Sequence, residues 1–205
     1  MDPKALYNIS YGIFLLGAKN GEKVNACITN TCMQVASDPV RIAISVINNN
    51  YTCDLIKESG YFSLSVLDKS CTFDFIRNFG YQSGRTVNKF ENFEYKSDSM
   101  GCPYVEKFAC SVISCKVVSK EDLGTHTLFI AEIQDAKVVR SNEPMTYSYY
   151  QSNVKPKAKV DNAKKIIGWR CKICGYEYMV ENLPADYTCP LCGHPAEDFE
   201  PIYEQ

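Results

Sequence analysis

Two Cys-x-x-Cys-Gly turns near the C-terminal end constrain this chain more than any other feature. The first runs from Cys171 to Gly175 and the second from Cys189 to Gly193, with fourteen residues between the two cysteine pairs. Each turn presents two sulfurs from one tight loop, and two facing turns form a tetrahedral site for zinc or iron. The glycine after each pair permits a positive φ, which can turn backbone N–H groups toward the sulfurs. We therefore predict one metal ion bound by Cys171, Cys174, Cys189 and Cys192.

The other cysteines and the net charge narrow the class of protein. Seven of the eleven cysteines lie outside the two turns and show no framework spacing, which is typical of a reducing cytosol rather than a disulfide scaffold. The net charge of −2 gives no electrostatic case for nucleic acid. The chain opens without a signal-peptide pattern, and its most apolar early stretch, residues 13–18, is too short to cross a bilayer. We expect a cytoplasmic protein with neither a membrane nor a nucleic acid as partner.

A change of composition after Tyr150 predicts three segments. Residues 1–150 are long enough to bury a core. Residues 151–165 carry five lysines, one proline and no aromatic residue, which is typical of a linker. Residues 166–205 hold seven acids and two bases, and they are too few to form a core without a metal. The linker lysines are either solvated or paired with an acidic module or partner.

The first segment carries mostly strand patterns. Alternating hydrophobic residues predict strands at 40–47, 61–67, 109–118 and 127–139. A short helix is predicted over residues 52–59, with Thr52 as its cap and Gly60 as its end, and another over residues 71–79, ended by Gly80. Short strands with a few brief helices favour a small β-barrel.

Two segments could bind an anion, although neither pattern is specific. No Gly-x-Gly-x-x-Gly or phosphate loop is present, which argues against a doubly wound nucleotide fold. Residues 48–52, Asn-Asn-Asn-Tyr-Thr, join a strand to a helix whose N–H groups would point at an anion, but an ordinary Asn-rich turn has the same sequence. Residues 83–85, Ser-Gly-Arg, and Lys89 supply cations beside a glycine, which suits a phosphate or an exposed turn.

A series of motifs over residues 5–150 resembles the flavin reductase-like split barrels. The motifs are VNACITNTCMQV (24–35, the family's flavin-contacting strand), DP (38–39), NYT (50–52), SGR (83–85), KF (89–90), HTLFI (126–130) and PMTY (144–147). The resemblance implies a mainly β, FMN-binding split barrel with short helices, NAD(P)H as electron donor, and a homodimer with flavins near the subunit interface. It implies no acid or base side chain in the hydride step. The FMN-binding residues that it implies are Asn25, Cys27, Ile28, Thr31, Gln34, Ser45, Asn48, Asn50, Thr52 and Arg85.

The C-terminal segment resembles rubredoxin in the runs CKICGYEY (171–178), LPADYTCPLCG (183–193) and DFE (198–200). The spacing between its cysteine pairs is shorter than in free-standing rubredoxins and closer to the module of rubrerythrins. The resemblance implies one iron held by the four cysteines and shielded from water by Trp169, Tyr178 and Phe199. A flavin reductase barrel fused to rubredoxin is the arrangement of the high-molecular-weight rubredoxins of anaerobic bacteria. That resemblance implies a flavodiiron-type acceptor that reduces oxygen or nitric oxide.

These patterns lead to an interpretation of the chain as an NAD(P)H-dependent oxidoreductase that transfers electrons from FMN to iron. Nicotinamide delivers two electrons as a hydride, a four-cysteine iron takes one, and a flavin can connect the two. We expect the linker to let the iron domain move between flavin and acceptor. Two alternatives remain open from the residues: a β-barrel binding module with a structural zinc ribbon, and a reductase that supplies free reduced flavin.

Overall fold

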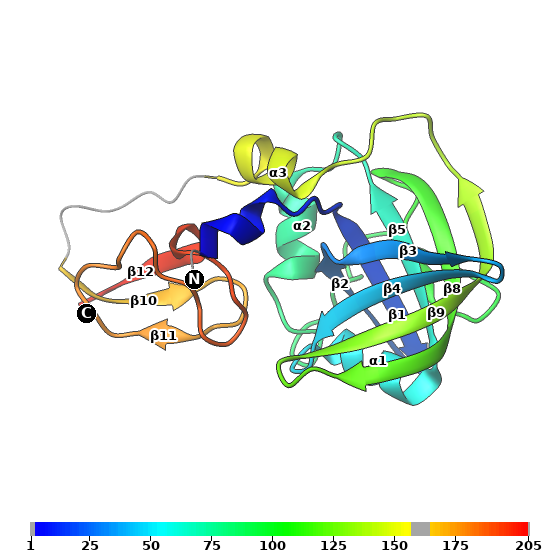
Figure 1. The fold of residues 1–205 in the computed structure, drawn as a ribbon, viewed down its shortest axis with the longest axis horizontal. Coiled ribbons are helices and arrows are strands. Elements are labelled where there is room, and N and C mark those ends of the chain that lie inside the picture. Colours follow the sequence, from blue (N-terminus) through cyan, green and yellow to red (C-terminus); the bar gives the residue numbers. More distant parts are fainter. Residues whose placement is uncertain (1–2, 157–164, 205) are drawn as a thin grey trace. The chain divides into compact units, whose positions relative to one another are not determined.

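The computed structural model describes residues 3–156 and 165–204, and the chain divides into two compact units, Met1–Lys155 and Pro156–Gln205 (Figure 1). Strands predominate over helices in both units, which confirms the predicted mainly β fold class. Residues 151–154 of the predicted linker continue the helical turn η2 (Tyr150–Val154), and residues 157–164 of that linker lie outside the described residues. Among the helices that the structure describes, none has the length and apolar character needed to span a bilayer.

The first unit is built on a seven-stranded antiparallel sheet. The strands follow one another in space in the order β2-β1-β5-β8-β9-β4-β3, and the sheet curls on itself (Figure 1). The elements of this unit are η1 (Pro3–Asn8), β1 (Phe14–Asn20), β2 (Lys23–Thr29), β3 (Cys32–Ser37), β4 (Val40–Ile47), α1 (Tyr51–Ser59), β5 (Tyr61–Leu67), α2 (Phe73–Gly80), β6 (Lys96–Ser97), β7 (Pro103–Tyr104), β8 (Ala109–Asp122), β9 (His126–Val138), α3 (Tyr147–Tyr149) and η2.

The expected single strand over residues 24–35 is two strands in the structure. β2 pairs with β1 and β3 pairs with β4, so the two strands form opposite edges of the sheet although only Asn30 and Thr31 separate them in the chain. The sequence pattern concealed this break because both strands carry the same mixture of small, polar and β-branched residues. The barrel is therefore split between β2 and β3, within the segment that resembles the family's flavin-contacting strand.

The prediction that Thr52 caps the first helix was wrong, because Asn50 occupies that position. Asn50 has the extended backbone of a cap residue (φ −78°, ψ 130°), and its side chain accepts a hydrogen bond from the Thr52 backbone N–H. The helix consequently begins at Tyr51, one residue earlier than predicted. Its predicted end is confirmed, since Gly60 adopts the left-handed conformation (φ 76°) and donates to the carbonyl of Ile56.

β1 was not predicted as a strand because it is buried on both faces and shows no alternation. Leu16 belongs to a core that includes Ile44 and Phe129, whereas Leu15 belongs to a second core that includes Phe75 and Phe79 of α2. β1 thus separates the interior of the curled sheet from the layer under α2.

The first strand of the β8–β9 hairpin is longer than predicted. The last residues of β8 are exposed and polar but still pair with β9, so they carry no hydrophobic alternation that would predict a strand.

The second unit is a small three-stranded antiparallel sheet with long loops. Its elements are β10 (Ile166–Cys171), β11 (Glu177–Tyr178), the 3₁₀ turn η3 (Ala196–Asp198) and β12 (Phe199–Tyr203), with the strand order β11-β10-β12. Its buried hydrophobic residues are two cysteines, Cys171 and Cys189, together with Phe199. Such a core is too small to hold a fold by itself, which makes the cysteine cluster the centre of this unit.

Candidate metal centre and cofactor site

The structure brings the four cysteine sulfurs of the second unit together. The Sγ atoms of Cys171, Cys174, Cys189 and Cys192 all lie within 4.8 Å of one another. The closest pairs are Cys174 with Cys189, at 3.4 Å, and Cys171 with Cys192, at 3.6 Å. Cys171 and Cys189 are buried, while Cys174 and Cys192 are partly exposed, so the cluster has one protected and one accessible side. These sulfurs are positioned for one metal ion.

The two glycines of the turns have the backbone that the sequence predicts. Gly175 has φ 78° and donates to the carbonyl of Cys171 at 2.9 Å, and Gly193 has φ 71° and donates to the carbonyl of Cys189 at 2.8 Å. The backbone N–H groups of Ile173 and Cys174 are bonded to the sulfur of Cys171. Such N–H groups stabilise a thiolate, so each turn is preorganised for a charged sulfur ligand.

The thiols of this cluster interact strongly through a shared hydrogen bond. The bond with Cys192 lowers the pKa of Cys171 to about 5, helped by the backbone N–H groups, and the same bond raises the pKa of Cys192. Burial raises the pKa of Cys174 to about 11. A bound metal would displace the protons of these thiols, since thiolates are the ligands. This donor set fits either zinc or iron.

Aromatic residues enclose the cluster, although not in the arrangement predicted. Phe199 is buried against the cysteines and Trp169 packs at their side. Tyr178 does not belong to this packed group but stacks on Tyr187 at a centroid distance of 4.5 Å, and Tyr187 contacts Phe199 at 5.4 Å. The sequence analysis missed Tyr187, which lies two residues before Cys189 in a loop without periodicity. Of the three residues expected to shield the metal, Trp169 and Phe199 thus pack against the cluster directly, and Tyr178 acts through Tyr187.

In the first unit, several of the predicted flavin-binding residues gather at the start of α1. The Asn25 side chain on β2 donates to the Thr52 hydroxyl at 2.9 Å, and both residues are buried. Cys27, on the same strand, lies beside the side chains of Thr52 and Asn50, and burial raises the pKa of its thiol. The segment that caps α1 is therefore bonded directly to the strand at one edge of the split.

The Ser-Gly-Arg loop reaches the same place. A Cβ atom at Gly84 would lie 2.1 Å from the Asn25 side-chain oxygen, so only glycine allows this close approach. Arg85 forms an ion pair with Asp54 in the first turn of α1, and its guanidinium lies 5.1 Å from the centroid of the Tyr51 ring. Arg85 and the Asn50 cap meet at the first turn of α1, although they are 35 positions apart in the chain, and together they supply polar donors that fit an anionic group.

The remaining predicted flavin-binding residues lie elsewhere. Ile28 packs against Gly80 at the end of α2, where an added Cβ would be 3.3 Å away. Thr31 occupies the gap between β2 and β3, and Gln34 is exposed on β3. Ser45 is partly buried on β4 opposite Leu128 of β9. These positions place part of the predicted set along the split and leave its role a prediction.

The Asn48 side chain is bonded within the protein, and its role in flavin binding stays a prediction. Its side chain donates to the carbonyl of Gly124 at 2.8 Å and to Asp122 at 3.1 Å, and it accepts from Lys57 at 3.2 Å. These bonds tie the start of α1 to the turn between β8 and β9. Because both its amide group and its carbonyl are already used, Asn48 has little capacity left for a cofactor.

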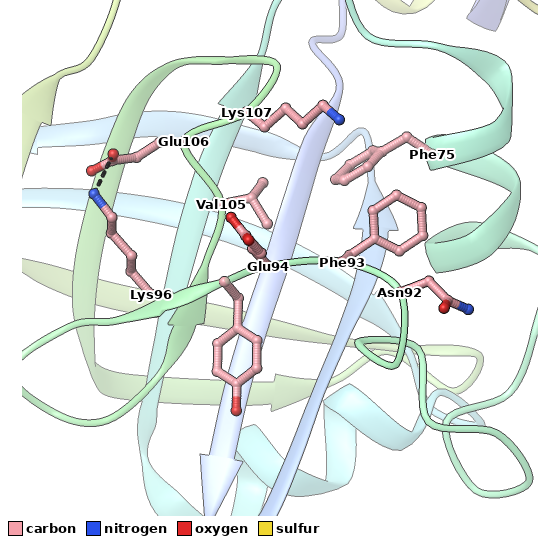
Figure 2. Close-up of a pocket in the computed structure, with 9 residues that line it drawn as sticks. Phe75, Asn92, Phe93, Glu94, Lys96, Val105, Glu106 and Lys107 are labelled. Atoms are coloured by element: carbon pink, nitrogen blue, oxygen red, sulfur yellow. Dashed lines mark hydrogen bonds and ion pairs between the residues drawn. The ribbon is translucent and has the colours of Figure 1, made fainter.

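A separate cleft of about 870 Å³ opens beside α2 (Figure 2). Phe75 and Phe93 meet edge to face at 5.4 Å on one side of it, and Lys96 forms an ion pair with Glu106 on the other. None of the ten predicted flavin-binding residues lines it. The lining residues are Phe75, Asn92, Phe93, Glu94, Tyr95, Lys96, Val105, Glu106 and Lys107.

Comparison with known protein families divides the chain in the same way as the structure does. Residues 6–158 match the flavin reductase like domain, and residues 169–200 match the rubredoxin-like domain of rubrerythrin. The first match covers well over half of the chain, and the second includes all four clustered cysteines.

Individual proteins show the same likeness. A high molecular weight rubredoxin of Moorella thermoacetica is 33% identical over 98% of this chain and all of its own length. A ferric-chelate reductase (NAD(P)H) of Archaeoglobus fulgidus is 40% identical over 73% of this chain and 89% of its own length. Among solved structures, an NADH:FAD oxidoreductase of Streptomyces globisporus superposes with a TM-score of 0.63 at 19% identity, covering 69% of this chain and 84% of that one. This last likeness concerns the fold.

Proposed function

Since this chain belongs to the flavin reductase-like family and continues into a rubredoxin-like domain, we propose that it takes a hydride from NAD(P)H onto FMN and passes single electrons through an Fe(Cys)4 centre to a protein acceptor. One observation carries the proposal: a flavin reductase-like unit and a four-sulfur metal site occur in one chain. When bound, a flavin accepts a hydride and returns electrons one at a time, which matches a two-electron donor to a one-electron metal.

The residues of the first unit would hold and orient the cofactor rather than act as acids or bases. Asn25, Thr52 and Asn50 form a hydrogen-bonded group at the start of α1, and the loop with Arg85 closes over it. The accessible members, Asn50 and Arg85, would bind the phosphate end of FMN, and the buried Asn25 and Thr52 would hold them in place. Ile28 and Thr31 lie at the split between β2 and β3 and would contact the ring and keep water from one of its faces.

In the second unit, the cysteines would hold iron and its surroundings would control access to it. The buried pair, Cys171 and Cys189, faces the aromatic residues, and the partly exposed pair, Cys174 and Cys192, faces solvent. Electrons would enter and leave on the accessible side, because transfer to another protein requires close approach. The match to a rubredoxin-like domain favours iron over zinc.

The charge of the second unit indicates what kind of protein could accept its electrons. Seven acids and two bases in residues 166–205 would favour an acceptor with a basic docking surface. We propose that the acceptor is a flavodiiron-type oxygen or nitric oxide reductase, on the basis of the resemblance to high-molecular-weight rubredoxins.

We further propose that the protein is a homodimer, supported by the exposed apolar side chains of Met33 and Val35 on the edge strand β3. The eleven unpaired cysteines favour the reducing cytosol of an anaerobe.

A second candidate acceptor is a soluble ferric chelate. The first unit is 40% identical to a ferric-chelate reductase, so electrons could leave the flavin without passing through the second unit. A Cys189→Ser variant separates the two routes. If this variant still reduces the ferric chelate, electrons leave the flavin by the direct route. If it reduces neither the chelate nor the protein acceptor, all electrons pass through the metal.

The experiment that tests the main proposal is an anaerobic absorbance spectrum of the full-length protein before and after addition of NADH and of NADPH. We expect overlapping flavin and ferric-thiolate bands, and we expect a reduced nicotinamide to bleach both. In Cys189→Ser the flavin band alone should remain and should still be bleached. A yellow protein that contains zinc would reduce the proposal to a flavin reductase with a structural zinc site, and a colourless protein would overturn it.

A further inference from the structure

Lys89 is a buried lysine whose ammonium group lies between two elements of the first unit. Its side chain is 4% exposed. Nζ donates to the carbonyl of Ala26 on β2 at 3.0 Å and to the carbonyl of Phe79 in α2 at 2.8 Å. From its sequence, Lys89 was a candidate for an exposed cation beside a glycine, and the structure instead places its charge inside the protein.

This charge has no carboxylate partner among the described residues. Two of the three N–H donors of Nζ go to neutral carbonyls, and the Cys27 thiol is a titratable group that interacts with the ammonium. Burial lowers the pKa of Lys89, because an ammonium is costly away from water, while Cys27 acts in the opposite direction. The C-terminal end of α2 compensates part of the charge. The charge would be further stabilised by an anion placed nearby.

Lys89 also holds the Ser-Gly-Arg loop in place. Its backbone carbonyl accepts from the Asn78 side chain at 2.7 Å, and its Nζ binds the carbonyl of Phe79, so residues 81–88 form a loop whose two ends are joined. Within this loop Gly84 presses against Asn25, and Arg85 reaches Asp54 on α1. Removal of the Lys89 bonds would therefore release the loop from the residues at the start of α1.

We propose that Lys89 is a positioning residue for the phosphate end of the flavin: it holds the 81–88 loop against β2 and α1 and supplies a buried positive charge there. Lys89 does not contact the cofactor directly in this role, because its ammonium is directed at Ala26 and Phe79. This inference rests on the proposed function, since it requires that the first unit binds a flavin. It predicts that the contribution of Lys89 depends on the phosphate group of the ligand.

The test compares FMN with riboflavin, which carries the same ring without the phosphate. Binding of each ligand to the flavin-free full chain is measured by quenching of flavin fluorescence, in the wild type and in Lys89→Met. This substitution keeps an unbranched side chain one atom shorter and removes its charge and its donors. We expect Lys89→Met to weaken FMN by about ten- to a hundredfold and riboflavin by about threefold or less. Lys116→Met, at an exposed lysine on β8, should bind both ligands as the wild type does.

The outcomes separate the two proposals. Wild-type protein that binds neither flavin would overturn the proposed function itself. If the wild type binds FMN, two results for Lys89→Met would overturn the role of Lys89. One is an equal loss of affinity for FMN and riboflavin, and the other is no loss of affinity for either. Should Lys89→Met fail to fold, the ¹⁵N resonance of the buried ammonium is followed in the wild type. FMN should shift it and riboflavin should not, and an equal shift with both ligands would contradict the proposal.

Discussion

At the scale of single residues, the metal centre depends on four side chains that act as one. Structural zinc sites bind with roughly 10–16 kcal/mol in total, so one of four ligands contributes about 3 kcal/mol, or about a hundredfold in affinity. Replacement of a single ligand should therefore lower metal affinity far more than the same substitution at a cysteine elsewhere in the chain. Cys110, which lies outside the cluster and is buried in the first unit, offers a comparison.

The first prediction concerns Cys189. We expect Cys189→Ser to lower metal affinity by about a hundredfold and to leave flavin binding unchanged, because the ligand lies in the second unit. Metal content by elemental analysis after dialysis, together with bound flavin, measures the outcome. Cys110→Ser is the matched control, since its Sγ lies 3.4 Å from the carbonyl of Val66 and a hydroxyl can donate there. Normal metal content in Cys189→Ser would argue against a four-sulfur site.

Glu106 provides a second prediction at this scale. It accepts from Lys137 at 2.8 Å and from Lys96 at 2.6 Å, and the Lys137 bond is the main cause that lowers the pKa of Glu106 from 4.5 to about 2. A carboxylate whose pKa is lower in the folded than in the unfolded protein stabilises the fold at any pH above the pKa of the unfolded state. This stabilisation is lost as the pH falls through the pKa of the folded state. The stabilisation should therefore disappear between pH about 4.5 and about 2.

We expect Glu106→Gln to lower the free energy of unfolding by about 0.5–1 kcal/mol at pH 7, a small effect because both lysines are exposed and Glu106 is only partly buried. The effect should vanish below pH about 2. Urea unfolding at several pH values measures the difference. Glu91→Gln is the control, since the Glu91 side chain is exposed. An effect of Glu106→Gln that did not change with pH would contradict the electrostatic cause.

At the scale of elements, the caps of short helices and the edges of the sheet determine how the proposed flavin site is built. α1 has nine residues, and such a helix depends on its termini and on packing more than on its own propensity. Asn50 provides the N-terminal cap, and the same residue lies next to Cys27 and Thr52. The start of α1 thus combines the helix cap with the proposed phosphate site.

We expect Asn50→Ala to cost about 1 kcal/mol in the free energy of unfolding, because the Thr52 backbone N–H loses its acceptor. Denaturant unfolding of the flavin-free protein measures this cost without the contribution of a ligand. Asn49→Ala is the matched control, since the neighbouring asparagine is exposed and does not cap the helix. Equal destabilisation by the two variants would show that the cap is not the cause.

The edge strand β3 provides a prediction about assembly. Met33 is 56% exposed on this strand, and an edge with apolar side chains is suited to pairing with a second copy. We expect Met33→Lys to raise the dimer dissociation constant by about tenfold or more, because the interface would bury an unpaired charge. Sedimentation velocity measures the change. Val138→Lys, at the far end of β9 and 79% exposed, should not affect it, and a dimer unchanged by Met33→Lys would exclude β3 from the interface.

At the scale of the whole molecule, the two units should differ in what holds them together. The first unit has two cores, one inside the curled sheet and one under α2, whereas the second has few buried hydrophobic residues besides its own metal ligands. The free energy of the second unit must therefore come largely from the metal. The first unit requires no metal for its fold.

We expect removal of the metal with a chelator to abolish the thermal transition of the second unit and to shift that of the first by less than about 2 °C. Differential scanning calorimetry of the full chain before and after chelation measures both transitions. Addition of metal to the stripped protein should restore only the lost transition. A common shift of both transitions would show that the two units unfold together.

Much of this organisation could be predicted from local sequence. The metal site was predictable because its four ligands come from two short turns with glycines at fixed positions, so nearby residues specify the geometry. Strands with alternating hydrophobic and small polar residues, such as β4 and β5, were predictable from alternation, although the structure buries both faces of β5. Gly60 correctly marked the end of α1. The flavin-binding barrel itself was predicted from resemblance, since no single motif in it is specific.

Only the tertiary structure showed how the residues of the proposed flavin site come together. The Asn25–Thr52 bond joins residues 27 positions apart, and the Lys89–Ala26 bond joins residues 63 positions apart. Sequence periodicity describes a segment and its own neighbours, so it carries no signal for such pairs. It also could not show that β1 is buried on both faces, that β2 and β3 form opposite edges, or that Lys89 points inward. Each of these depends on what packs against the segment, which is fixed only when the sheet has curled and α2 has covered it.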